Sequence, residues 1–162
     1  MRTLARKSLL LLAAFCLPQA VAAAPKPSPA KESRVSQDPV DVVMQMIKAW
    51  DDRDGDKIAD LFTDDGVLHS MMIDPIKGRE NIRPRMKFLV DNASYMKIEP
   101  RNIAVKGNTV FLERTDSFTF KGHSGKVPVV GVLEIRDGKV AEWREYYDRK
   151  ELLEAMGVGD DF

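Results

Sequence analysis

Three charged residues lie where strands buried on one face normally carry apolar side chains. Because side chains alternate between the two faces of a strand, Arg114 and Asp116 share one face of an apolar run. In a later run, Glu145 shares a face with Trp143 and Tyr147. A charged side chain that faces an apolar interior is costly unless it is paired. The sequence therefore predicts that these faces line a pocket in which the three charges pair.

Two carboxylates and one arginine in an apolar site favour acid–base chemistry. Two close carboxyl groups cannot both ionise cheaply, so one is expected to keep its proton and serve as an acid. The planar arginine fork stays charged and can hold both of them. The alternative for Arg114, Asp116 and Glu145 is an ion-pair cluster that only orders the fold.

Other kinds of catalytic site lack the residues that they need. The two histidines, His69 and His123, are far apart, and the single cysteine, Cys16, lies near the start of the chain. This pattern has no metal-ligand spacing. No glycine-rich phosphate loop or Ser–His–Asp order is readable, so we expect neither a metal nor a cofactor.

Helices come first among the elements that must position these side chains. Asp38 and Pro39 predict a capped helix that ends near 51–55, and a short helix is expected over 56–62. Residues 63–66 predict a turn before a strand over 67–73. A longer helix is expected over 79–92, and a last helix over 149–156 that stops at Gly157.

Strands fill the second half of the chain. A strand over 95–103 contains Pro100, which predicts an edge strand or a bulge. Further runs follow at 110–120, 127–135 and 140–147, and Asp137-Gly138 is a strong hairpin signal. This order predicts an α+β fold, a curved antiparallel sheet that forms a cone and is packed with the N-terminal helices.

The N-terminal segment has the composition of an export signal. Residues 1–22 combine a basic start, a short apolar run and small residues, which predicts a cleaved signal peptide and a secreted or periplasmic protein. The apolar run is too short for a stable membrane span. Residues 23–38 are predicted to be a disordered leader, 39–157 the folded domain and 158–162 a tail.

The charge balance argues against nucleic acid as a partner. Removing residues 1–22 takes away three of the 25 basic residues and none of the 25 acidic ones, which leaves 25 − 3 = 22 positive charges against 25 negative, a net charge of −3. A polyanion-binding protein normally carries a basic excess. The expected partner is a small apolar molecule.

Several short motifs resemble one known family. Glu113–Asp116, Val130–Val132, Asp137–Val140 and Trp143–Asp148 follow one another in the order and spacing of the limonene-1,2-epoxide hydrolase-like family, within the nuclear transport factor 2-like cone superfamily. Asp65–Val67 and Gly78–Glu80 fit earlier segments. The resemblance covers about residues 39–156.

The resemblance implies one-step attack of water on an epoxide, without a cofactor. Carried onto the matching positions, Arg114 is the bridging arginine, Asp116 the general acid and Glu145 the base that activates water. Glu145 replaces the family's aspartate. The family's water-positioning Tyr-x-Asn is here Leu68-His69-Ser70. Leu68, Ser70, Trp143 and Tyr147 are the expected substrate- or water-binding residues.

Two other functions fit the same fold. The altered Leu68, Ser70 and Glu145 favour a binding protein that holds a small apolar ligand without turnover. A ketosteroid isomerase-like enzyme would need one carboxylate base and an oxyanion donor such as Tyr95 or Tyr147. By analogy with other members of the fold, a homodimer that pairs through the outer sheet face is also possible.

Overall fold

The computed structural model of the protein describes residues 37–159 and 162. The predicted signal peptide and nearly all of the predicted leader lie outside these residues. Within them, helices and strands follow in the order α1 (Pro39–Asp51), α2 (Gly55–Asp60), β1 (Phe62–Ser70), β2 (Ile76–Lys77), α3 (Arg79–Asp91), β3 (Ala93–Lys106), β4 (Thr109–Phe120), β5 (His123–Arg136), β6 (Lys139–Tyr146) and α4 (Arg149–Met156).

Helices α1 and α4 begin at the capping residues that the sequence indicates. The Asp38 carboxylate accepts a hydrogen bond from the Val40 backbone N–H at 2.9 Å, and the Asp148 carboxylate accepts one from the Glu151 N–H at 3.0 Å. Each bond satisfies a backbone donor that the helix itself leaves free. Helix α4 ends at Gly157 with a φ of 67°, a conformation that glycine adopts at little cost.

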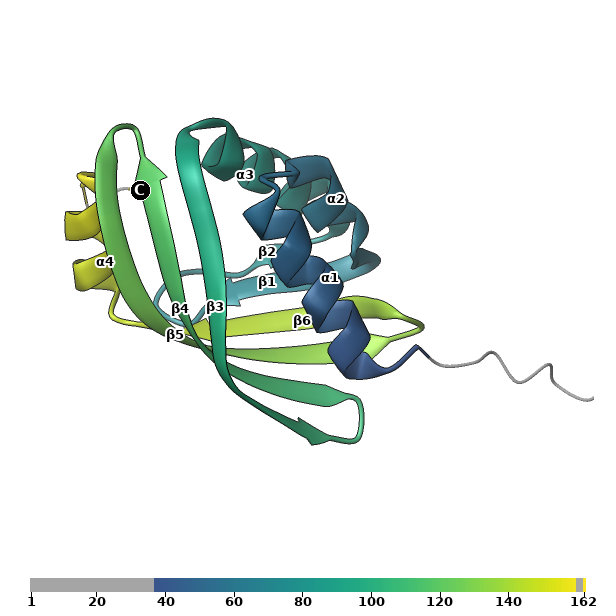
Figure 1. Cartoon of the computed structure of the whole chain (residues 1–162). Coiled ribbons are helices and arrows are strands. Elements are labelled where there is room, and N and C mark those ends of the chain that lie inside the picture. Colours follow the sequence, from purple (N-terminus) through teal and green to yellow (C-terminus); the bar gives the residue numbers. More distant parts are fainter. Residues whose placement is uncertain (1–36, 160–161) are drawn as a thin grey trace, which may run out of the picture. The chain divides into compact units, whose positions relative to one another are not determined.

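One curved sheet holds all six strands of the described chain, in the order β2-β1-β6-β5-β4-β3 (Figure 1). The expected antiparallel pairing is found for every neighbouring pair except β1 and β6, which run parallel. Strand β1 reaches the sheet through a long connection rather than a hairpin, so a parallel neighbour is allowed. This pairing sets Ser70 opposite Glu145.

The hairpin signals and the edge strand agree with the structure. Asp137 and Gly138 both have positive φ, 53° and 73°, as the predicted two-residue turn requires. Strand β3 pairs with β4 alone, and its register shifts between Pro100 and Asn102. The strand is therefore both an edge and bulged, the two outcomes that Pro100 indicates.

The prediction of a turn at 63–66 is wrong. These residues lie inside β1, as an irregularity between the Phe62↔Val140 and Val67↔Glu142 pairs. Two hydrogen bonds keep this backbone extended. Arg79 Nε donates to the Phe62 carbonyl at 2.9 Å, and the Gly78 N–H donates to the Gly66 carbonyl at 2.7 Å. Strand β1 also ends earlier than predicted, and β2 was not foreseen.

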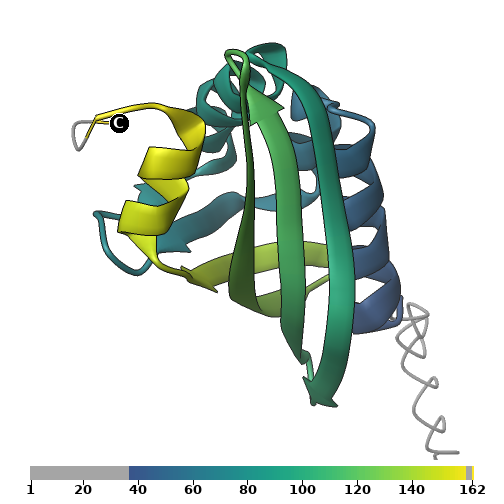
Figure 2. The ribbon, with the colours of Figure 1, turned by 60° about the vertical axis from the view of Figure 1, so that its left-hand side comes forward.

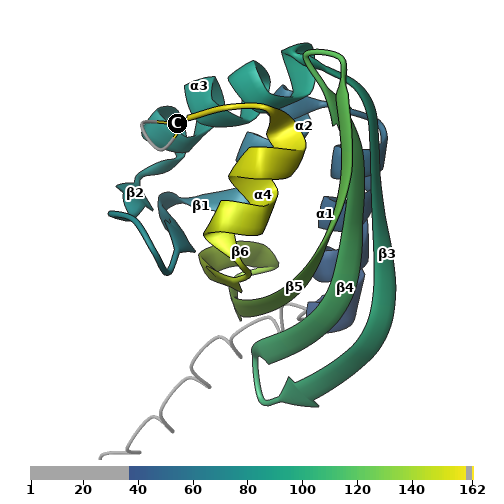
Figure 3. The same cartoon turned by 90° about the vertical axis from the view of Figure 1, so that its left-hand side faces the viewer.

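The sheet curls around a hollow that helices close. Helix α1 lies inside the curve of β3, β4 and β5, and α3 runs along one rim (Figures 2 and 3). Helix α4 crosses the remaining opening and packs on the tips of β4 and β5. One buried cluster joins α1, α2 and α3 to the sheet, and a second lies under α4, where Val158 and Phe162 also pack. The face of β4 that carries Arg114 and Asp116 points into the space between these two buried clusters.

Candidate active site

Arg114, Asp116 and Glu145 form one connected cluster on the inner face of the sheet. Arg114 Nε and Nη2 donate to the two carboxylate oxygens of Asp116 at 2.8 and 2.9 Å, and Nη2 also donates to Glu145 Oε1 at 2.5 Å. The Arg114 side chain is only 3% exposed, that of Glu145 18% and that of Asp116 26%. The predicted pairing of the three charges inside a pocket therefore describes the geometry correctly.

The cluster rests on a floor of aromatic rings. The Arg114 guanidinium carbon lies 5.3 Å from the centre of the Trp143 ring, which stacks on Phe62 and meets the edge of Trp50. Gly131, on the neighbouring strand β5, leaves the space that this arrangement needs. A Cβ at Gly131 would lie 2.7 Å from Arg114 Nη1 and 3.0 Å from Trp143 Nε1. Both nitrogens are buried without a hydrogen-bond partner among the described residues.

The two carboxyl groups differ in burial and in the number of hydrogen bonds that they accept from Arg114. Burial raises the pKa of Glu145; the positive charge of Arg114 opposes the rise and the negative charge of Asp116 adds to it. Burial would lower the pKa of Arg114, but the carboxylates of Asp116 and Glu145 outweigh burial and raise it, so the guanidinium stays charged. Arg114 holds both oxygens of Asp116 and one oxygen of Glu145. Burial therefore favours the protonated form of Glu145.

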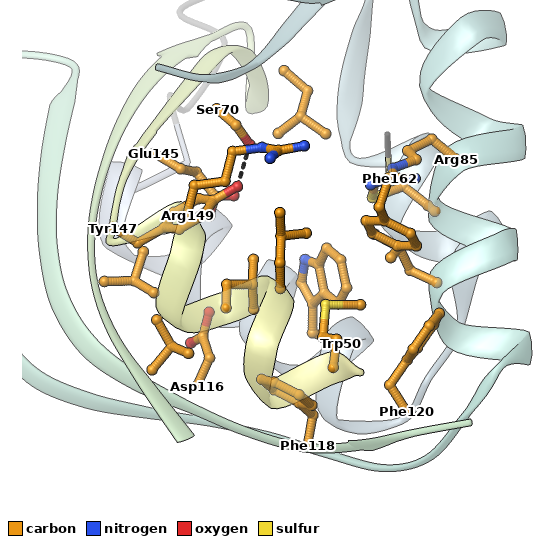
Figure 4. A pocket seen from close by; sticks show the side chains of 18 of the residues that line it. Trp50, Ser70, Arg85, Asp116, Phe118, Phe120, Glu145, Tyr147, Arg149 and Phe162 are labelled. Carbon is orange, nitrogen blue, oxygen red and sulfur yellow. Dashed lines mark hydrogen bonds between the residues drawn. The ribbon is translucent and has the colours of Figure 1, made fainter. Parts of the chain in front are cut away.

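Two hydroxyl groups lie beside Glu145. The Tyr147 hydroxyl donates a hydrogen bond to Ser70 Oγ at 3.0 Å, and Ser70 is the register partner of Glu145 in the parallel β1–β6 pair (Figure 4). Burial raises the pKa of Tyr147, so the phenol keeps its proton at neutral pH. Leu68 lies two residues before Ser70 on the same face of β1 and contributes only apolar surface to the cavity wall.

The cluster opens into a mostly apolar cavity of about 170 Å³. Its lining residues come from α1, β1, β2, α3, β3, β4, β5, β6 and α4. Figure 4 shows several of these side chains around the cavity. All seven residues predicted to form the site line it, namely Leu68, Ser70, Arg114, Asp116, Trp143, Glu145 and Tyr147. Tyr95, the other candidate oxyanion donor, is 51% exposed and pairs with Thr119 on the outer face of the sheet, so it does not contribute.

Several site residues were not identified from the sequence as functional. Trp50, in the first predicted helix, packs on Trp143 and lines the cavity. Gly131 was noted as part of a motif but not for its close contact with Arg114; a glycine inside a strand is the signal for such an approach. Arg85 and Phe162 also line the cavity, and no local pattern marks either.

No metal-binding group of histidine, cysteine or acidic side chains occurs among residues 37–159 and 162. Nor does that part of the chain contain a helix long and apolar enough to cross a membrane.

Comparison with known proteins assigns the domain. Residues 43–143 match the SnoaL-like domain, which is more than half of the chain. The chain belongs to the SnoaL-like domain family. The structure shares its fold with nuclear transport factor 2-like proteins, so the predicted fold class is confirmed.

Individual relatives agree with this assignment. The epoxide hydrolase EphG of Mycobacterium tuberculosis is 23% identical over 114 residues, which cover 70% of this chain and 76% of that protein. The structure of an M. tuberculosis LEH-like epoxide hydrolase has a TM-score of 0.65 at 22% identity, over 73% of this chain and 88% of that one. A ketosteroid isomerase-like fold protein from Catenulispora acidiphila, in complex with trimethylamine, has a TM-score of 0.66 at 20% identity, over 75% and 95%.

Proposed function

We propose that this protein is a cofactor-independent epoxide hydrolase that adds water to a small epoxide by paired-carboxylate catalysis. One observation carries the proposal: a single buried arginine, Arg114, contacts the carboxyl groups of both Asp116 and Glu145 at the end of an apolar cavity. Similarity to an epoxide hydrolase over 70% of the chain supports it.

The proposed roles of the two carboxyl groups are the reverse of those that the family resemblance implies. Glu145 is the general acid, because burial raises its pKa and it receives one hydrogen bond from Arg114. Asp116 is the general base, because Arg114 holds both of its oxygens and its side chain is the more exposed of the two. The remaining lone pairs of Asp116 can accept a proton from water at the cavity surface.

The reaction then proceeds in one step. Water attacks an epoxide carbon while Asp116 takes one of its protons, and the carbon–oxygen bond of the ring breaks. The proton of Glu145 moves to the departing oxygen, which gives a vicinal diol. Return of a proton from Asp116 to Glu145 restores the starting state. Each proton transfer of this kind contributes about 10²–10⁴-fold in rate.

The altered water-binding segment fits this division of roles. Leu68 offers no hydrogen bond to water, whereas the Ser70 and Tyr147 hydroxyls lie on the Glu145 side of the cluster. There the Ser70 hydroxyl, which accepts the hydrogen bond of Tyr147, can donate its own proton to the negative charge that develops on the epoxide oxygen. Water is held from the Asp116 side instead.

A turnover assay tests the proposal. The wild-type protein is incubated with a panel of small cyclic and phenyl-substituted epoxides, and diol formation is measured by gas chromatography. Asp116→Asn lowers the rate by at least about 10²-fold, while the exposed Asp52→Asn, at a side chain 52% exposed, leaves it unchanged. A wild-type protein that converts no epoxide in the panel contradicts the proposal.

The division of roles has its own test. Electron-withdrawing substituents stabilise the alkoxide that leaves the ring, so such epoxides depend less on an acid. They partly restore the rate of Glu145→Gln and do not restore the rate of Asp116→Asn. Rescue of Asp116→Asn alone would assign the acid to Asp116.

A second candidate is a binding protein that holds a small molecule without turnover. The apolar Leu68 in place of a water-binding residue favours it, and a structural neighbour of the same fold is known in complex with trimethylamine. A ligand that raises the melting temperature and is recovered unchanged supports this function; recovery of the diol excludes it.

Export is part of the proposal. The order of basic, apolar and small residues over 1–22 supports cleavage of a signal peptide and a secreted or periplasmic location. Sequencing of the N-terminus of the mature protein, purified from cells that express the full chain, tests this. A mature protein that begins at Met1 contradicts it.

A further inference from the structure

Arg85 is a cation that lines the cavity apart from the acid–base cluster. The Arg85 side chain, on α3, is only partly exposed, and its guanidinium carbon lies 4.3 Å from the centre of the Phe162 ring. Within residues 37–159 and 162, Arg85 forms no ion pair with a carboxylate. By contrast, Arg83 on the same helix contacts Asp56 and Asp60.

This arginine is held at an electrostatic cost. Burial lowers the pKa of Arg85; Tyr147 partly opposes this effect, and the positive charge of Arg149 adds to it. Arg149, on α4, lines the same cavity (Figure 4). Asp74 also borders the cavity but forms no ion pair with Arg85 in the described structure. A partly desolvated guanidinium that forms no ion pair with a described carboxylate is best stabilised by an anion that enters the cavity.

The cavity therefore has two polar ends. Figure 4 shows Arg85 beside Phe162 on one side, with Glu145 and Tyr147 on the other. Apolar side chains line the rest of the cavity, among them Leu89, Phe120 and Leu152. A ligand that satisfies both ends has an apolar body and one negatively charged group.

The size of the cavity limits that body. About 170 Å³ is close to the roughly 150 Å³ of an apolar cavity that accepts benzene. The apolar part is therefore about the size of one six-membered ring.

We propose that the ligand is a small apolar carboxylate, whose ring or short chain fills the cavity and whose carboxylate binds Arg85. Resting on the proposed function, this makes the substrate an epoxide that carries a carboxylate. Arginine suits the role because its planar fork can donate two parallel hydrogen bonds to one carboxylate.

Binding of unreactive analogues tests the proposal without any turnover. Isothermal titration compares phenylacetate and 3-phenylpropanoate with the corresponding neutral alcohols. Whichever of the two carboxylates binds more tightly is expected to bind the wild-type protein at least about ten-fold more tightly than the corresponding alcohol, because its hydrogen bond to Arg85 is charge-assisted. Arg85→Gln removes this preference and Arg85→Lys retains part of it. Arg101→Gln, at an exposed arginine on β3, leaves the preference unchanged.

The outcomes separate this inference from the proposed function. Equal binding of carboxylates and alcohols, no binding of either, or a preference that survives in a folded Arg85→Gln protein overturns the Arg85 site. If the carboxylates bind through Arg85 but 3-phenyloxirane-2-carboxylate is recovered unchanged, the anion site stands and the hydrolase function fails. If styrene oxide and this epoxy acid are hydrolysed equally well, the hydrolase function stands and the anion site fails.

Discussion

Gly131 gives the sharpest test of how the cluster is held, because one added methyl group displaces it. In Gly131→Ala the new Cβ would lie 2.7 Å from Arg114 Nη1, whereas ordinary contacts begin at about 3.4 Å. The guanidinium must therefore move by 3.4 − 2.7 = 0.7 Å, or the strand must shift by the same distance. The new Cβ would also lie 3.0 Å from Trp143 Nε1, so a shift of the Cβ toward Trp143 cannot relieve the contact.

The consequence for catalysis follows from this displacement. Arg114 sets the positions of Asp116 and Glu145, so all three groups shift together. A misplacement of about 1 Å in an active site costs roughly 10²-fold in rate. We therefore expect Gly131→Ala to lower kcat for epoxide hydrolysis by about 10²-fold, and overpacking to lower the free energy of unfolding by about 1–3 kcal/mol.

Gly55→Ala is the matched control. Its Cβ would lie 2.9 Å from the Lys87 Cα, at a contact between α2 and α3 that includes no cavity residue. This variant is expected to lose similar stability and keep its kcat. Diol formation gives the rates, and denaturant titration gives the stabilities. A Gly131→Ala protein with wild-type kcat would refute the close packing of Arg114 as the basis of the site.

Three further variants give independent tests. Arg114→Met leaves two partly buried carboxyl groups without a counter-charge, so the free energy of unfolding at neutral pH falls by up to about 3–5 kcal/mol, and by less at acid pH. Because burial raises the pKa of Glu145, its contribution to stability is complete below its ordinary pKa of 4.5 and is lost as pH rises through the raised value; Glu145→Gln removes this pH dependence. Phe111 and Val130 are each 41% exposed on the outer sheet face, where the expected homodimer would pair. Phe111→Asp therefore converts the dimer to a monomer in sedimentation velocity, whereas the control Val105→Asp does not.

Each of these tests has a clear contrary result. Denaturant titration of Arg114→Met that shows no loss of stability would mean that the ion pairs are not desolvated. A stability difference between wild type and Glu145→Gln that grows in favour of wild type as pH rises would reverse the sign of the Glu145 shift. A wild-type protein that sediments as a monomer would exclude the dimer.

The sequence predicted the cluster because strand alternation is a local property. Arg114 and Asp116 had to share a face whatever the tertiary fold, and the Asp137-Gly138 turn fixed the direction in which β6 returns. The family motifs then placed Glu145 beside them. Local periodicity also gave α1, α3 and α4 nearly to the residue.

Features that depend on distant contacts could not be predicted in this way. The parallel pairing of β1 with β6 arises from a long connection, and it alone sets Ser70 opposite Glu145. Arg85 resembles any other helix charge until α4 and Phe162 close over it. The proposal that Glu145 is the acid rests on its burial, which is a property of the assembled cavity.

The most direct test of the proposed chemistry is a single turnover in ¹⁸O-labelled water. Excess enzyme is mixed with an epoxide that it hydrolyses, and the diol from the first turnover is analysed by mass spectrometry. If Asp116 activates water for direct attack, this diol carries one ¹⁸O atom, and Asp116→Asn forms no diol above the buffer rate. A first-turnover diol without ¹⁸O would instead show that a carboxylate of the enzyme attacks the epoxide, and would contradict the proposed mechanism.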